Sequence, residues 1–116
     1  MRKLMTLGVL FMVMSLSAQD KNAKGSLDVD GVCGMCKARI EKAAIKITGV
    51  KSVKWSVETH ELNVIYDARK TSLDSVAKYV SLAGHDTKKY TAPDQAYNAV
   101  NPCCKYRDQE VVKAHQ

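Results

Sequence analysis

Apolar and polar positions follow two different periods in the first half of the chain. Residues 25–30 alternate between the two kinds, which predicts a short strand. After a loop with two glycines at 31–36, the period changes to three and four, which predicts an amphipathic helix with one buried face. The apolar residues of that face are Ile40, Ala43, Ala44 and Ile47. Gly49 stands where a helix end favours glycine.

The second half repeats this change of period. Segments 50–57 and 62–66 alternate on either side of a tight turn, so they predict a hairpin. A second helix is expected to begin at Thr71-Ser72, where a hydroxyl can cap it, and to stop at Gly84. A fourth strand, poor in β propensity, is predicted over 85–91.

The order strand, helix, strand, strand, helix, strand predicts an α+β fold. A ferredoxin-like βαββαβ sandwich fits this order, with a four-stranded antiparallel sheet and both helices on one face. In that arrangement the third strand lies between the first two, and the fourth lies beside the first. We expect one domain at 25–91, a polar lead-in at 19–24 and a short helical or irregular C-terminal tail at 92–116.

The N-terminus has the three-part pattern of a secretory signal peptide at residues 1–18. Two basic residues precede an apolar run of about 13 residues, too short for the ~20 that a spanning helix needs. Cleavage is expected after Ser17 or Ala18, and the alternative is an uncleaved anchor. The pattern predicts a periplasmic or secreted protein without a stable membrane anchor after cleavage.

Charge gives little support for a nucleic-acid partner. The formal net charge is +6, but loss of the signal peptide removes Arg2, Lys3 and no acidic residue, which leaves +4. The remaining basic residues are spread out, and aromatic residues make up only 6% of the chain. A continuous basic surface and a stacking platform for bases are therefore not expected.

The chemistry of the chain is concentrated in Cys33-Gly34-Met35-Cys36. Two cysteines at this spacing, where a loop enters a helix, can direct both sulfurs to one point. The helix N-terminus favours the thiolate form of Cys36. Two thiolates make a soft site that prefers Cu(I) or Hg(II) over Mg, Ca or Mn, whereas a closed zinc site needs four ligands. A structural disulfide, a redox pair and half of a zinc site remain alternatives.

At this point the chain resembles the heavy-metal-associated domain family of copper chaperones, copper-pump N-terminal domains and periplasmic mercury-binding proteins. The resemblance covers 25–91 and rests on the segments Val29–Cys36, Ala38–Ala43, Thr48–Val50 with Val53, and Ala83–His85. It implies the ferredoxin-like fold and assigns metal ligation to Cys33 and Cys36.

Two departures from the family pattern stand out. Asp30-Gly31-Val32 replaces the usual Gly-Met-Thr, whose methionine packs under the metal loop, so the loop is expected to be supported differently. His85 stands where many bacterial copper chaperones have tyrosine. Because a histidine in that turn approaches the metal in some members, the resemblance makes His85 a candidate third ligand, or else a loop residue.

The tail carries two further cysteines, Cys103 and Cys104, after a short helix predicted over 92–100. Chain length allows this tail to reach back to the metal loop. Three arrangements stay open: extra thiolates for the Cys33/Cys36 site, a disulfide with one of those cysteines, or pairing with another molecule.

These features together predict an exported protein that binds Cu(I) and either buffers it or transfers it, with a metal-donating or metal-accepting protein as its partner. The candidate metal ligands are Cys33, Cys36, His85, Cys103 and Cys104. The alternatives are Hg(II) capture, Zn(II) as the ion, or thiol–disulfide exchange. The chain contains no other catalytic pattern, so we do not expect an enzyme.

Overall fold

Three strands form an antiparallel sheet in the computed structural model, which describes residues 20–116. They are β1 (Ala23–Asp28), β2 (Val50–Trp55) and β3 (Glu61–Tyr66). The order is β1-β3-β2, with β3 antiparallel to both neighbours. The third strand therefore lies between the first two, as predicted. The predicted signal peptide lies outside the described residues.

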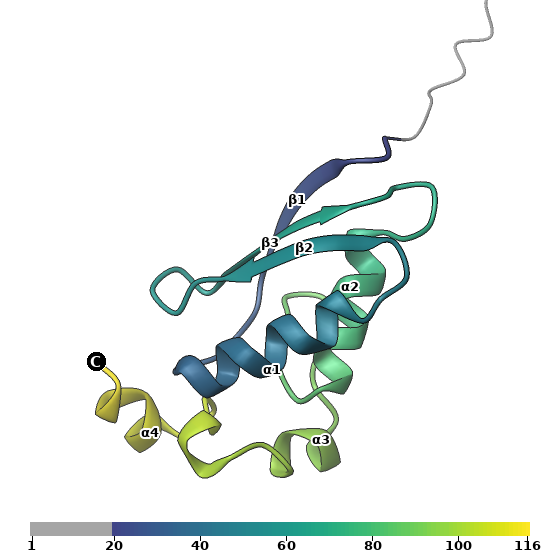
Figure 1. The fold of residues 1–116 in the computed structure, drawn as a ribbon. Coiled ribbons are helices and arrows are strands. Elements are labelled where there is room, and N and C mark those ends of the chain that lie inside the picture. The colour runs from purple at the N-terminus through teal and green to yellow at the C-terminus, as the bar shows by residue number, and fades with distance from the viewer. Residues whose placement is uncertain (1–19) are drawn as a thin grey trace, which may run out of the picture.

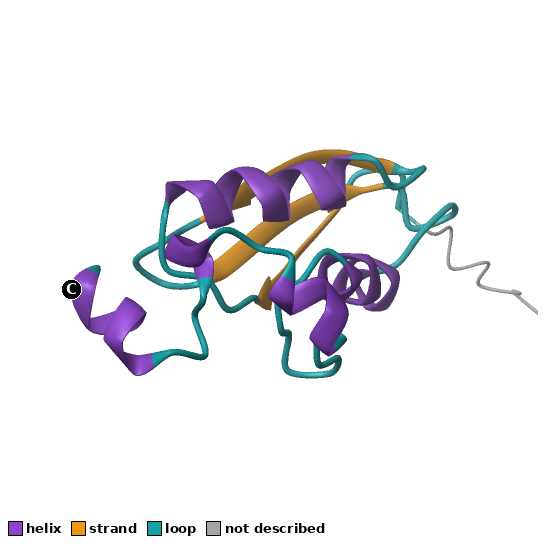
Figure 2. Ribbon diagram, turned by 90° about the horizontal axis from the view of Figure 1, so that it is seen from below, coloured by secondary structure: helices purple, strands orange, loops and turns teal. Residues whose placement is uncertain are grey.

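Two helices cover the same face of this sheet, α1 (Gly34–Ile45) and α2 (Leu73–Leu82) (Figure 1). Figure 2 shows the helical layer from below, with the sheet behind it. Leu62 and Val64 of β3 are buried beneath the helices. The helices contribute fully buried residues at helical spacing, Ile40, Ala44, Val76 and Val80. The predicted α+β layering is thereby confirmed. Of the apolar face predicted for the first helix, Ile40 and Ala44 are buried, whereas Ala43 is half-buried and Ile47 is half-buried just after the end of α1.

The predicted fourth strand is reduced to one isolated bridge, between Val29 and Thr87. The Thr87 N–H donates to the Tyr90 carbonyl at 2.8 Å, and the Tyr90 N–H donates to Thr87 Oγ1 at 3.0 Å. These groups are engaged in a local turn, so they cannot continue a ladder along β1. The expected four-stranded sheet is corrected to three strands and one bridge, located beside β1 as predicted.

Because the chain turns at 87–90, the tail runs back toward the N-terminus of α1. It contains α3 (Asp94–Asn98), the 3-10 helix η1 (Pro102–Cys104) and α4 (Gln109–Ala114). The Tyr106 hydroxyl donates to the Gly84 carbonyl at 2.6 Å and accepts from the Asp86 N–H at 2.9 Å.

Within residues 20–116, no helix is both long and apolar enough to cross a membrane.

Gly84 allows the tail to run back toward the N-terminus of α1 in two ways. Its φ of +111° lies in the region that side chains rarely adopt. A Cβ there would also stand 2.7 Å from Val100 Cγ1 and 2.9 Å from the Ala96 carbonyl oxygen. The turn that ends α2 therefore also provides the surface against which the tail packs.

Candidate metal centre

The first two cysteines lie at the start of α1. Cys33 is the N-cap residue, with extended backbone (φ −150°, ψ 174°), and Cys36 lies in the first turn. Their sulfurs are 3.4 Å apart. Gly31 approaches closely from the loop, since a Cβ there would stand 3.0 Å from both the Cys36 Cβ and the Trp55 ring. The loop-to-helix transition thus directs both sulfurs to one place, as the spacing predicted.

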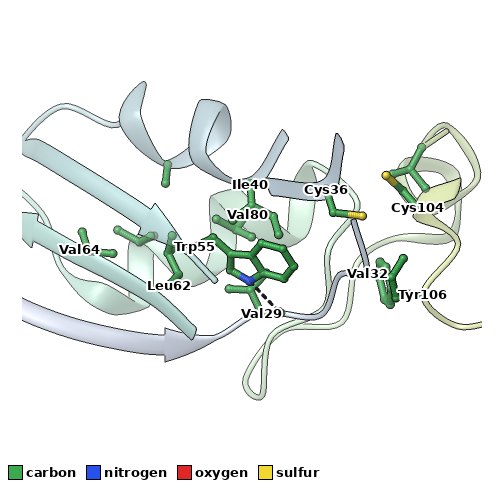
Figure 3. Close-up of a cluster of buried hydrophobic side chains, with 13 residues drawn as sticks. Val29, Val32, Cys36, Ile40, Trp55, Leu62, Val64, Val80, Cys104 and Tyr106 are labelled. Carbon is green, nitrogen blue, oxygen red and sulfur yellow. Dashed lines mark hydrogen bonds between the residues drawn. The ribbon is translucent and has the colours of Figure 1, made fainter. Parts of the chain in front are cut away.

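The tail brings the other two cysteines to the same place. The Cys33 Sγ is 3.3 Å from the Cys104 Sγ and 3.9 Å from the Cys103 Sγ. The sulfurs of Cys33, Cys103 and Cys104 all lie within 4.8 Å of one another. Figure 3 shows the sulfurs of Cys36 and Cys104 pointing toward each other, one from α1 and one from the tail. We call these four residues the sulfur cluster, and all four are free thiols.

The thiols of the sulfur cluster differ in acidity. Partial burial raises the pKa of Cys33, but hydrogen bonds from the Cys36 N–H and from the Cys104 and Cys36 thiols outweigh it, so its pKa is about 7. Burial dominates at Cys36 and Cys104 and raises the pKa of both. Cys33 is therefore the first of these three thiols to ionise, and it is only half-buried. The cluster offers one accessible thiolate backed by buried thiols.

A family model described as the heavy-metal-associated domain matches residues 26–86. The match covers more than half of the chain, from β1 to the end of α2, and includes Cys33 and Cys36. This chain belongs to the heavy-metal-associated domain family. Cys103 and Cys104 lie beyond the matched residues, so the tail adds two sulfurs to the family's cysteine pair.

Relatives within the heavy-metal-associated family are named for two different metals. The mercuric transport protein periplasmic component of Serratia marcescens is 36% identical over 61 residues, covering 52% of this chain and 67% of the relative. Copper chaperone CopZ of Staphylococcus haemolyticus is 27% identical over 63 residues, covering 53% and 93%. A solved CopZ metallochaperone aligns with a TM-score of 0.54 at 30% identity, covering 56% and 98%. These likenesses confirm the predicted family resemblance.

The unusual lead-in to the heavy-metal-associated loop is supported by apolar packing. Val32 is buried against the core, in the loop where the family pattern expects different residues. The Trp55 indole N–H donates to the Val29 carbonyl at 3.0 Å, and the ring is almost fully buried. Figure 3 shows this bond, with Trp55 lying between Ile40 and Val29. The tryptophan of β2 thus holds the strand that leads into the site.

His85 is fully buried and packs between the loop and the tail. Its Nδ1 is 2.8 Å from the Asp30 carbonyl oxygen, and its ring stacks on Tyr106 with centroids 5.4 Å apart. Because a carbonyl only accepts, Nδ1 carries the proton and Nε2 keeps its lone pair, for which the described residues offer no hydrogen-bond partner. Burial lowers the pKa of His85, which favours the neutral form of the ring. The group of close metal-ligating atoms does not include it, and its ligand role stays a prediction.

Three residues that contribute to the site, Met35, Tyr106 and Arg107, were not identified from the sequence. Met35 places its Sδ 3.3 Å from the Cys103 Sγ, and its position between the two cysteines was the available signal. Tyr106 and Arg107 hold the tail in place; the Arg107 guanidinium pairs with Asp86 at 2.7 Å and lies over the Tyr97 ring. These residues gave no signal in the sequence, because their role depends on the path of the tail.

The donor set fits a soft ion. With a metal–thiolate bond of ~2.3 Å, three sulfurs around one ion lie ~4 Å apart. The sulfur separations of 3.3, 3.4 and 3.9 Å around Cys33 are shorter than that spacing by at most about 0.7 Å, so small side-chain shifts would admit an ion. Among the described residues, no carboxylate of the kind that Mg or Ca prefers belongs to this group of ligand atoms. The residues present therefore suit Cu(I), Hg(II) or a similar thiophilic ion.

Proposed function

We propose that this chain is an exported Cu(I)-binding protein that buffers the ion or passes it to a partner protein. Copper is the cargo, and its ligands are drawn from Cys33, Cys36, Cys103 and Cys104. The observation that carries the proposal is the return of the tail, which sets the Cys104 sulfur 3.3 Å from the Cys33 sulfur. Export is supported by the signal-peptide pattern at residues 1–18.

The geometry suggests how the ion enters and leaves. Cys33 is half-buried and has the lowered pKa, while Cys36 and Cys104 are fully buried. An arriving ion would meet the Cys33 thiolate first and then the buried sulfurs behind it. The same exposed sulfur lets a partner's thiolates attack the ion during transfer, so the ion is never free in solution.

The test is a titration of reduced protein with Cu(I) against a competing chelator. Cys33→Ser/Cys36→Ser is expected to lower the affinity by more than ~100-fold, since even neighbours of metal ligands change affinity by 10–100-fold. His115→Ala is the control, because its exposed imidazole lies outside the cluster. Unchanged affinity in the double variant would refute the proposal.

Mercury(II) capture is the second candidate, favoured by the 36% identity with a mercuric transport protein. Both ions suit thiolates, so the sulfur cluster alone does not choose between them. Growth of a deletion strain with copper or mercury in the medium separates the two. Copper sensitivity without mercury sensitivity supports the first candidate, and the reverse supports the second.

A further inference from the structure

A methionine sulfur, that of Met35, lies next to the sulfur cluster. Met35 is the only methionine in residues 20–116 and lies in the first turn of α1, between Cys33 and Cys36. Met35 is 52% exposed, so its sulfur can be reached from solvent. The Sδ lies 3.3 Å from the Cys103 Sγ, and the Asn101 side-chain nitrogen lies 3.6 Å from it.

The five sulfurs form an inner and an outer group, and the sulfurs of Cys33 and Cys104 are common to both. On the inner side, the Cys33 sulfur lies close to the two fully buried sulfurs, those of Cys36 and Cys104. On the outer side, the Cys103 sulfur lies within 4.8 Å of those of Cys33 and Cys104. Met35 extends this outer side, because it contacts Cys103. The inner side is the deeper, since Cys36 and Cys104 are fully buried, whereas Cys103 is half-buried and Met35 is exposed.

A single low-coordinate ion binds fewer than five sulfurs. The two sulfurs nearest the surface, those of Met35 and Cys103, combine a thioether with a thiol. A thioether carries no charge and needs no deprotonation, and together with thiolate it selects Cu(I). Zinc sites use thiolate, imidazole and carboxylate ligands instead. A thiolate and a thioether in contact at the surface therefore fit a second copper ion better than a zinc ion.

We propose that Met35 and Cys103 complete a second, outer Cu(I) position, with Cys33 and Cys104 shared between the two ions. The inner ion is held by Cys33, Cys36 and Cys104. The outer ion is the one that exchanges with a partner, because its ligands reach the surface. This inference rests on the proposed copper function and adds to it a ligand, a stoichiometry and an order of release.

The test is an anaerobic titration of the reduced protein with an acetonitrile complex of Cu(I). The protein is labelled with methyl-13C methionine, and the Met35 resonance is assigned by its absence from Met35→Leu. The readouts are copper retained per protein after desalting and the chemical shift of that methyl group. Both readouts are independent of copper transfer to a partner.

We expect the wild-type chain to retain two Cu(I) ions, with the Met35 methyl resonance moving during the second equivalent. Met35→Leu and Cys103→Ser are expected to retain one ion. Asn101→Ala is the matched control, because it removes the amide next to Met35 Sδ and leaves every sulfur in place. It should retain two ions.

Three results would overturn this inference, and they differ in what else they affect. Equal copper retention in the wild type and Met35→Leu, or a Met35 methyl resonance that copper does not move, refutes the outer position and leaves the proposed function standing. Failure of the wild-type chain and all variants to retain copper refutes both. Met35 is exposed, so the leucine variant is expected to fold, and a circular dichroism spectrum equal to that of the wild type checks that it has.

Discussion

At the scale of single residues, the acidity of Cys33 sets when the site can react. The wild-type thiol has a pKa of about 7, well below the ~8.5 of a free cysteine. In the copper-free reduced protein, the rate of Cys33 alkylation by iodoacetamide should rise with pH, pass its midpoint near pH 7 and level off above pH 8. Peptide mass spectrometry measures this rate residue by residue.

The buried Cys36 is the internal reference for that experiment. Its thiol has a raised pKa and no exposed surface, so it should react more slowly than Cys33 at every pH between 6 and 8. A Cys33 rate that still rises about threefold between pH 8 and pH 9, as that of an ordinary thiol with a pKa of ~8.5 does, would show that the hydrogen bonds around its sulfur do not stabilise the thiolate.

Core packing can also be tested residue by residue, because α1 has isoleucines in two environments. Ile40 is fully buried, so Ile40→Ala should lower the free energy of unfolding by about 2–5 kcal/mol. Ile45, on the same helix, is 45% exposed, so Ile45→Ala should cost less than about 1 kcal/mol. Urea denaturation measures both, and similar losses would contradict the assignment of the buried face.

At the scale of elements, the predictions succeeded where local spacing is decisive. The alternation of β3 and the three-and-four spacing of α1 were sufficient, because each places a continuous apolar face on the helix–sheet core. The predicted fourth strand does not form, because Thr87 and Tyr90 form hydrogen bonds with each other instead of with β1. Alternation in the sequence does not reveal such a competing turn.

The turn at Gly84, which connects α2 to the tail, can be tested by substitution. Gly84→Ala places a side chain at positive φ and against Val100, so it should lower stability by about 1–3 kcal/mol and detach the tail. Detachment should speed the alkylation of the buried Cys104. Gly34→Ala is the control, because its φ is not positive and nothing lies within 4 Å of the added Cβ. Equal effects of the two substitutions would contradict the role of Gly84.

At the scale of the whole molecule, the site combines a family domain with a segment beyond it. Sequence reasoning located Cys33 and Cys36, because a two-residue gap at a helix start is a local pattern. It left open whether Cys103 and Cys104 would join them. That outcome depends on contacts distant in sequence, such as the Tyr106 hydroxyl on the Gly84 carbonyl and Arg107 on Asp86.

The central claim is that sulfurs from the α1 loop and from the tail bind the same copper ion. X-ray absorption at the copper edge, on protein loaded with one equivalent of Cu(I), counts those sulfurs directly. We expect three sulfur ligands in the wild type and two in Cys104→Ser. Two sulfur ligands in both proteins would contradict the account, because they would reduce the site to Cys33 and Cys36 alone.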